Sequence, residues 1–120
     1  HQPSASALNS LGIALYYQRN FAEAARALEQ ATQLDPKIYQ SFGNLGTVER
    51  HLPGRQDSAR AHLTHAITLI RQSLALNPSS HNSWANLAEY SAKLGDTQAV
   101  DDALARIPPD VQALYGERLG

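Results

Sequence analysis

Few residues of this 120-residue chain have a spacing that could support chemistry. His62 and His65 lie three residues apart, close enough on one helix face to share a metal ion. No carboxylate or third histidine stands at helical spacing to complete such a site, so we expect no metal and interpret both residues as solvated or packing histidines. Asp101 and Asp102 are adjacent and point to different helix faces, which excludes them as an acid–base pair.

The composition excludes further classes of site. The chain has no Cys, and therefore no disulfide, thiolate zinc site or cysteine nucleophile. It has no Gly-rich phosphate loop and no Ser-centred elbow, so we expect neither catalysis nor a cofactor. The net charge of −1 argues against non-specific nucleic-acid binding, which needs a basic face. No apolar run approaches the roughly 18 residues that span a bilayer, so we expect no insertion into a membrane.

Three similar segments recur along the chain and must position any functional residues. The pairs Leu11-Gly12, Leu45-Gly46 and Leu87-Ala88 are spaced 34 and 42 residues apart. A turn signal follows each pair after the same interval, at Asn20, Gly54 and Asp96. A repeat of this length indicates stacked supersecondary units.

The segments between the turn signals have helical periodicity. Between Phe21 and Leu34 the apolar residues recur at steps of three and four, and no segment alternates long enough for a strand. Asn20 and Glu23 have the spacing of a capping box at the start of that helix. The sequence predicts an all-α fold with helices near residues 5–18, 21–34, 39–51, 57–76, 81–94, 97–107 and 110–118.

These repeats resemble the tetratricopeptide repeat family. The matching residues of the first repeat are Leu8, Leu11, Gly12, Leu15, Phe21, Ala24, Leu28, Ala31 and Pro36. Those of the second are Phe42, Leu45, Gly46, Ala66, Ile70 and Pro78, and those of the third are Trp84, Leu87, Ala88, Leu94 and Gly95. The small residues are needed where the two helices of a repeat cross closely.

The resemblance covers nearly the whole chain and implies its architecture. It implies three stacked helix-turn-helix units in a right-handed superhelical array, forming a single domain over residues 1–120. The units lie at about 5–38, 39–80 and 81–108. A terminal helix at 109–118 either caps the array or begins a fourth repeat.

Two repeats depart from the usual length. The turn keeps its register, so the eight extra residues of the second repeat must follow Gly54. They should lengthen its second helix by about two turns, roughly 12 Å, with a solvated side formed by Arg60, Thr64, Thr68 and Arg71. Pro108-Pro109 should end the second helix of the third repeat about one turn early.

The aromatic residues divide into two groups. Phe21, Phe42, Trp84 and Tyr90 stand at repeat-phased or stripe positions, which predicts packing in the core. Tyr16 and Tyr17 are adjacent and therefore about 100° apart on a helix. Both cannot face one core, so one of them should lie on the surface.

The resemblance also implies a binding surface. In this family the first helix of each unit lines a concave face along which extended peptides lie. Mapped from the Leu-Gly pairs, this face comprises Asn9, Ile13, Tyr16, Tyr17, Gln40, Asn44, Thr47, Arg50, His51, Asn82, Asn86, Glu89 and Lys93. Asn44 and Asn86 resemble the family's asparagine that bonds a peptide backbone, although either could instead bond a neighbouring helix. Asn82 and Asn86 stand where a carboxylate clamp would have cations, so we expect no such clamp.

The sequence thus predicts a non-enzymatic scaffold for protein–protein interaction that binds a peptide or partner helix in this groove. The alternative is a structural spacer or self-association module within a larger regulator. The stretch from Leu52-Pro53-Gly54-Arg55 to Leu94-Gly95-Asp96 is similar to the C-terminal repeat regions of bacterial multidomain signalling proteins. The chain begins with His1 and has no Met, so we expect it to be part of a longer protein or a mature product. We expect a location in the cytoplasm rather than the periplasm.

Overall fold

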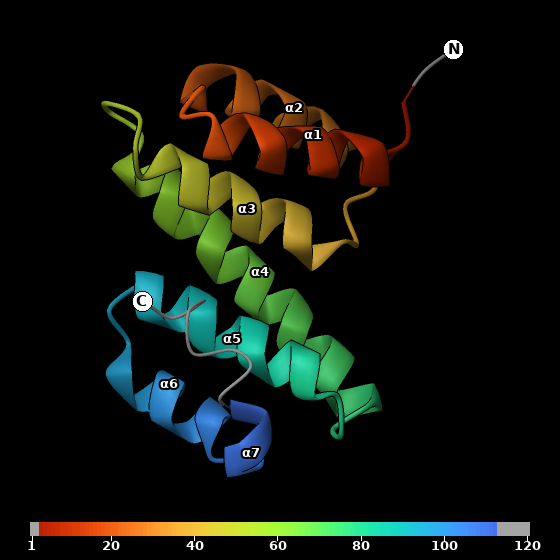
Figure 1. Ribbon diagram of the computed structural model, residues 1–120, viewed down its shortest axis with the longest axis vertical. Coiled ribbons are helices and arrows are strands. Elements are labelled where there is room, and N and C mark those ends of the chain that lie inside the picture. The colour runs from red at the N-terminus through yellow and green to blue at the C-terminus, as the bar shows by residue number, and fades with distance from the viewer. Residues whose placement is uncertain (1–2, 113–120) are drawn as a thin grey trace. The chain divides into compact units, whose positions relative to one another are not determined.

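A computed structural model describes residues 3–112 of the chain, which form helices joined by turns (Figure 1). The helices are α1 (Ala5–Tyr17), α2 (Phe21–Leu34), α3 (Tyr39–Glu49), α4 (Gln56–Leu76), α5 (His81–Lys93), α6 (Thr97–Leu104) and α7 (Pro109–Gln112). No strand occurs within this described range, and the predicted all-α fold is confirmed. The predicted terminal helix begins as α7, and its continuation to residue 118 lies outside the described residues.

The chain divides into two compact bodies, which we treat separately. The N-terminal body, His1–Ala66, holds α1, α2, α3 and the first half of α4. The C-terminal body, Ile67–Gly120, holds the remainder of α4 together with α5, α6 and α7. Within the N-terminal body α2 packs against both α1 and α3, and within the C-terminal body α5 packs against α6 (Figure 1).

The glycines of the first two Leu-Gly pairs lie where helices touch. A Cβ atom on Gly12 would come within 2.5 Å of the buried Leu28 side chain in α2. A Cβ atom on Gly46 would lie 2.7 Å from Cγ of Leu63 and 2.9 Å from the backbone oxygen of Ala59, both in α4. Any side chain at either position would therefore push the two helices apart, which confirms the role predicted for these small residues.

The core of the N-terminal body centres on one stripe of α2. Ala24, Ala25 and Leu28 cluster there with Leu45 and Val48 of α3. Leu15, Tyr16, Phe21 and Leu52 pack around this cluster and are partly buried. The small alanines let α2 approach its neighbours closely, while leucine and valine fill the remaining space.

The aromatic residues of the core prediction are buried to different extents. Tyr90 is fully buried, whereas Phe21, Phe42 and Trp84 are only partly buried. The indole N–H of Trp84 donates a 2.8 Å hydrogen bond to the carbonyl of Pro78. The guanidinium of Arg106 lies 5.0 Å from the centre of the Trp84 ring. Trp84 therefore lies at the edge of the core of the C-terminal body, in contact with polar groups, rather than in the core itself.

The helix lengths agree with those expected from the repeat spacing. α4 is continuous over 21 residues, whereas α2 has 14 and α6 has eight. The predicted solvated side of α4 is exposed at all four positions, Arg60, Thr64, Thr68 and Arg71. α3 ends two residues earlier than predicted and α6 ends three residues earlier. In both cases backbone N–H groups of the following turn bond the last carbonyl groups of the helix.

The predicted capping box at the start of α2 is wrong. Asn20 occupies the N-cap position, but its side chain makes no capping hydrogen bond. The backbone closes the turn instead, with the N–H groups of Arg19 and Asn20 bonding the carbonyls of Tyr16 and Leu15 at 2.9 Å each. Arg19 adopts a φ of 64°, a left-handed conformation that is uncommon for a residue with a side chain.

Candidate functional site

The N-terminal body brings predicted residues of α1 together with residues of α3 and of the turn that follows it, in two pairs. The amide Nδ2 of Asn44 donates a 3.0 Å hydrogen bond to Oδ1 of Asn9. The hydroxyl of Tyr16 lies 3.4 Å from Nε2 of His51. Each pair joins residues 35 positions apart, and the two pairs are separated by two helical turns, or about 10.5 Å.

These pairs define one surface, which we call the α1–α3 polar face. Its residues are Asn9, Ile13, Tyr16, Asn44, Thr47 and His51. Ile13 and Thr47 fall between the two pairs by helical spacing and are partly buried. The hydroxyl of Thr47 donates to the carbonyl of Gly43 in its own helix at 2.8 Å. The face is therefore polar at its amide pair and more aromatic at its other end.

The Asn9–Asn44 bond uses little of the hydrogen-bonding capacity of the two amides. A carboxamide has two N–H donors and an oxygen that accepts twice. Among residues 3–112, neither the Asn9 nor the Asn44 side chain makes any hydrogen bond other than this one. The pair thus joins α1 to α3, so Asn44 bonds a neighbouring helix, which was one of the two alternatives for it. Both amides retain donors and acceptors for a further partner.

Tyr16 and His51 also belong to a cluster of aromatic and basic residues at the end of α1, which we call the aromatic-basic cluster. The His51 ring stacks on Phe21, with ring centres 4.4 Å apart and planes 9° from parallel. The Tyr16 ring meets His51 edge-on at 5.5 Å. The guanidinium of Arg19 lies 5.5 Å from the centre of the Phe21 ring. The cluster comprises Tyr16, Tyr17, Arg19, Phe21, Arg50 and His51.

The electrostatics of the cluster favour an anionic ligand. Burial lowers the pKa of His51 below its ordinary value of 6.5, and the charges of Arg50 and then Arg19 lower it further. Within residues 3–112 no carboxylate forms an ion pair with Arg19 or Arg50. The Tyr17 ring, which meets the Tyr16 ring edge-on at 5.5 Å, is largely exposed. Two cations therefore stand beside an accessible aromatic surface.

The lowered pKa of His51 gives a prediction with a definite sign. Replacing Arg50 with glutamine removes a like charge, so the pKa of His51 should rise toward its ordinary value. In the wild type, the folded state disfavours protonation of His51. The neutral His51 ring therefore contributes to the stability of the fold above pH 6.5, and this contribution is lost as the pH falls through the folded-state pKa. NMR titration of the His51 ring signals measures this pKa directly. An unchanged or lower value in Arg50→Gln would contradict the assigned role of Arg50.

Sequence reasoning missed two members of the cluster. The place of Phe21 on the α2 stripe predicts the core, yet the ring is only partly buried and one of its faces stacks on His51. Arg19 lies in the turn between α1 and α2, and its left-handed backbone could not be read from the residue type. One sequence signal was available: Tyr16 and Phe21 are five residues apart across a turn, so both rings lie where α1 ends and α2 begins.

The predicted residues of the C-terminal body lie on α5. Lys93 and Glu89 form an ion pair of 3.5 Å, and Nζ of Lys93 lies 5.9 Å from the centre of the Tyr90 ring. Asn82 is exposed, whereas Asn86 is buried. Lys93 therefore has an acidic neighbour one turn away on its own helix.

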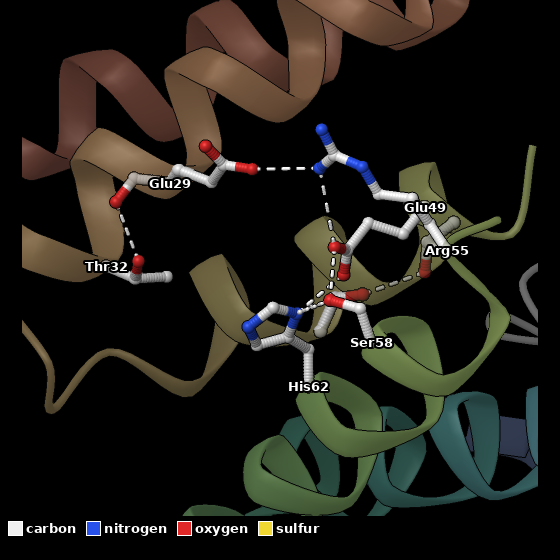
Figure 2. Close-up of polar contacts among 8 residues, drawn as sticks. Glu29, Thr32, Glu49, Arg55, Ser58 and His62 are labelled. Carbon is white, nitrogen blue, oxygen red and sulfur yellow. Dashed lines mark hydrogen bonds and ion pairs between the residues drawn. The ribbon is translucent and has the colours of Figure 1, made fainter. Parts of the chain in front are cut away.

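A buried carboxylate links three helices of the N-terminal body (Figure 2). Glu49 of α3 accepts a 2.6 Å hydrogen bond from Oγ of Ser58 in α4. Nδ1 of His62 lies 2.5 Å from the other carboxylate oxygen. Nη1 of Arg55 lies 3.6 Å from Glu49 and donates a 3.0 Å hydrogen bond to Glu29 of α2. We call this group the Glu49 network.

The geometry of the Glu49 network is structural rather than catalytic. In a hydrolytic triad the hydroxyl and the carboxylate bind opposite nitrogens of the imidazole ring. Here both approach the same nitrogen, because Oγ of Ser58 lies 3.4 Å from Nδ1 of His62 and bonds Glu49 directly. The hydroxyl thus has no separate base to accept its proton. The network instead satisfies a buried charge where α3 meets α4.

The two histidines spaced three residues apart have contacts other than a metal. His62 belongs to the Glu49 network, and the ring of His65 meets Phe42 edge-on with centres 4.4 Å apart. Across residues 3–112 no group of three His, Asp or Glu side chains is placed to hold a metal ion. None of the helices in that range has the length and apolar character needed to cross a membrane.

Comparison with known proteins places one repeat of the chain in a family. Residues 5–38, which contain α1, α2 and the turn that follows, match the model of the tetratricopeptide repeat. No curated protein matches the chain. Together with the all-α fold and the glycines at the helix crossings, this match supports a tetratricopeptide repeat at residues 5–38 and, in general terms, a scaffold for protein–protein interaction.

Proposed function

We propose that the chain binds an extended peptide segment of a partner protein along the α1–α3 polar face. The observation that carries this proposal is the alignment of two pairs, Asn9–Asn44 and Tyr16–His51, along one side of α1, where α3 and the turn after it lie. The amide pair offers donors and acceptors that match a peptide backbone of any sequence. The aromatic-basic cluster offers a surface that distinguishes one side chain from another.

The spacing of the pairs sets the length of the ligand. Two helical turns separate the amide pair from the cluster, or about 10.5 Å. An extended peptide rises about 3.3 Å per residue, so this interval corresponds to about three residues. We expect a ligand with an acidic side chain about three positions from the residue whose backbone meets Asn9 and Asn44.

Charge determines the preference within the cluster. Arg19 and Arg50 favour a carboxylate, while the rings of Tyr16 and Phe21 pack against the aliphatic part of the same side chain. Such contacts are partly exposed, so binding should be weak and should weaken further as salt screens the charges.

Selection from a random peptide library tests this proposal. Peptides of 12 residues displayed on phage are selected on the immobilised chain, synthesised with a fluorescent label, and titrated by anisotropy. The selected peptides should be enriched in Asp or Glu at one position. The variant Asn9→Ala with Asn44→Ala should bind them about tenfold more weakly, since two neutral hydrogen bonds are worth roughly 0.5–1.5 kcal/mol each.

Two matched variants serve as controls in the same titration. Gln30→Ala removes an exposed amide of α2, and Arg26→Ala removes an exposed cation of α2, so neither should change the affinity. Arg50→Gln should weaken binding and reduce its dependence on salt. Equal binding by the wild type and the Asn9/Asn44 variant, or selection without acidic enrichment, would contradict the proposed mode.

The alternative function is a spacer or self-association module within a larger regulator, of the bacterial signalling kind that the sequence resembles. In that case the selection would yield no peptide whose affinity depends on the α1–α3 polar face. The part of the peptide groove predicted for the third repeat stays a separate prediction, which can be tested with alanine variants of Asn82, Asn86, Glu89 and Lys93.

A further inference from the structure

The turns between the two helices of each repeat share one unusual backbone position. Within residues 3–112 three residues have a left-handed backbone, Arg19, Gly54 and Gly95, with φ values of 64°, 74° and 78°. Each stands two residues before the second helix of its repeat, which is α2, α4 or α6. Two of the three positions hold glycine, which adopts this conformation without strain. The first repeat holds an arginine there instead.

The backbone of the first turn does not require an arginine. The N–H groups of Arg19 and Asn20 bond carbonyls three and five residues earlier, at 2.9 Å each. Those of Gly95 and Asp96 make the same two bonds at 3.0 Å in the third repeat. Nothing lies within 4 Å of the position of a Cβ atom on Gly95, so this kind of turn has room for a side chain. The cost of arginine in such a turn is therefore backbone strain.

The contacts of Arg19 within the chain do not offset this strain. Its guanidinium lies 5.5 Å from the centre of the Phe21 ring. An exposed cation–π contact stabilises a fold by less than one left-handed residue destabilises it. Arg19 is exposed, and across residues 3–112 no carboxylate forms an ion pair with it. Strained residues that the fold does not require are characteristic of functional sites.

We propose that Arg19 determines the preference for an acidic ligand, and that the chain retains the strained turn because it holds this guanidinium in the aromatic-basic cluster. The Phe21 ring restrains the guanidinium, so less freedom is lost when a carboxylate binds to its paired N–H groups. Arg50 has the same charge but makes no such ring contact among residues 3–112. This role rests on the proposed function, since it concerns the same ligand.

The variant Arg19→Gly should change ligand preference and stability in opposite directions. The probes are a labelled acidic peptide from the phage selection and the same peptide with its acidic residue replaced by the matching amide. The wild type should bind the acidic form about fivefold more tightly in anisotropy titrations. Arg19→Gly should reduce this ratio at least threefold and leave the affinity for the amide form unchanged. Its melting temperature should rise by about 3 °C, because the turn is no longer strained.

Two further variants separate the charge of Arg19 from its backbone. Arg19→Asn removes the charge and tolerates the left-handed conformation without the flexibility of glycine, so it should reduce the ratio to the same extent. Gly95→Arg introduces the same strain in the third repeat, so it should lower the melting temperature by about 3 °C and leave the ratio unchanged.

The outcomes distinguish this role from the proposed function. If neither peptide bound the wild type, the proposed function would fail, and the role of Arg19 would fail with it. If both peptides bound the wild type but the ratio survived in Arg19→Gly and Arg19→Asn, only the role of Arg19 would be overturned. A fall in the melting temperature of Arg19→Gly would also overturn it, because the arginine would then be required by the fold.

Discussion

Replacing Glu49 with alanine should lower the free energy of unfolding by about 3 kcal/mol. The Glu49 carboxylate is buried and receives Ser58, His62 and Arg55, so the substitution removes a set of charge-assisted contacts at once. It also leaves a space between α3 and α4. Urea denaturation followed by circular dichroism measures the difference.

The matched control is Glu29→Ala, which removes the other carboxylate bound to Arg55. Its side chain and that of Arg55 are each 43% exposed, so water screens the pair and the loss should stay below about 1 kcal/mol. A loss for Glu49→Ala as small as that for Glu29→Ala would mean that the network contributes little to the fold.

Replacing Gly46 with alanine should destabilise the N-terminal body by about 2–3 kcal/mol. The added methyl group would meet the backbone oxygen of Ala59 at 2.9 Å, and backbone yields less readily than a side chain. Relief therefore requires α3 and α4 to separate, which also weakens the Glu49 network beside them. The same urea experiment reports the change.

Gly54→Ala separates this clash from the general cost of losing a glycine. Nothing lies within 4 Å of the position of its Cβ atom, but its φ of 74° is left-handed. The expected loss is about 1 kcal/mol from backbone strain alone. If Gly46→Ala cost no more than Gly54→Ala, the close approach of α3 and α4 would not be a determinant of stability.

The helices could be predicted well from the sequence because their signals are local. The apolar steps of three and four placed α2 at its observed bounds, and the repeat spacing anticipated the 21 residues of α4. The capping box failed because its two residues fit the sequence pattern while the backbone of Arg19 and Asn20 closes the turn by itself. Local patterns do not reveal which of two competing hydrogen-bond arrangements forms.

The site was harder to predict because it depends on register between helices. Asn9, Tyr16, Asn44 and His51 could each be assigned to a face, but their pairing at an interval of 35 follows from how α1 lies on α3. The Glu49 network was missed because a glutamate near a helix end is ordinarily solvated. The exposure of Leu11 could not be foreseen, since its residue type and phase match those of the buried Leu45.

The proposed peptide site can be tested most directly by NMR mapping with a selected acidic peptide. Amide and side-chain signals of Asn9, Ile13, Tyr16, Asn44, Thr47 and His51 should shift on titration. The pKa of His51 should rise in the complex, because a bound carboxylate offsets the effect of Arg50 and Arg19. Shifts confined to other surfaces, with the His51 pKa unchanged, would contradict a ligand-binding role for the α1–α3 polar face.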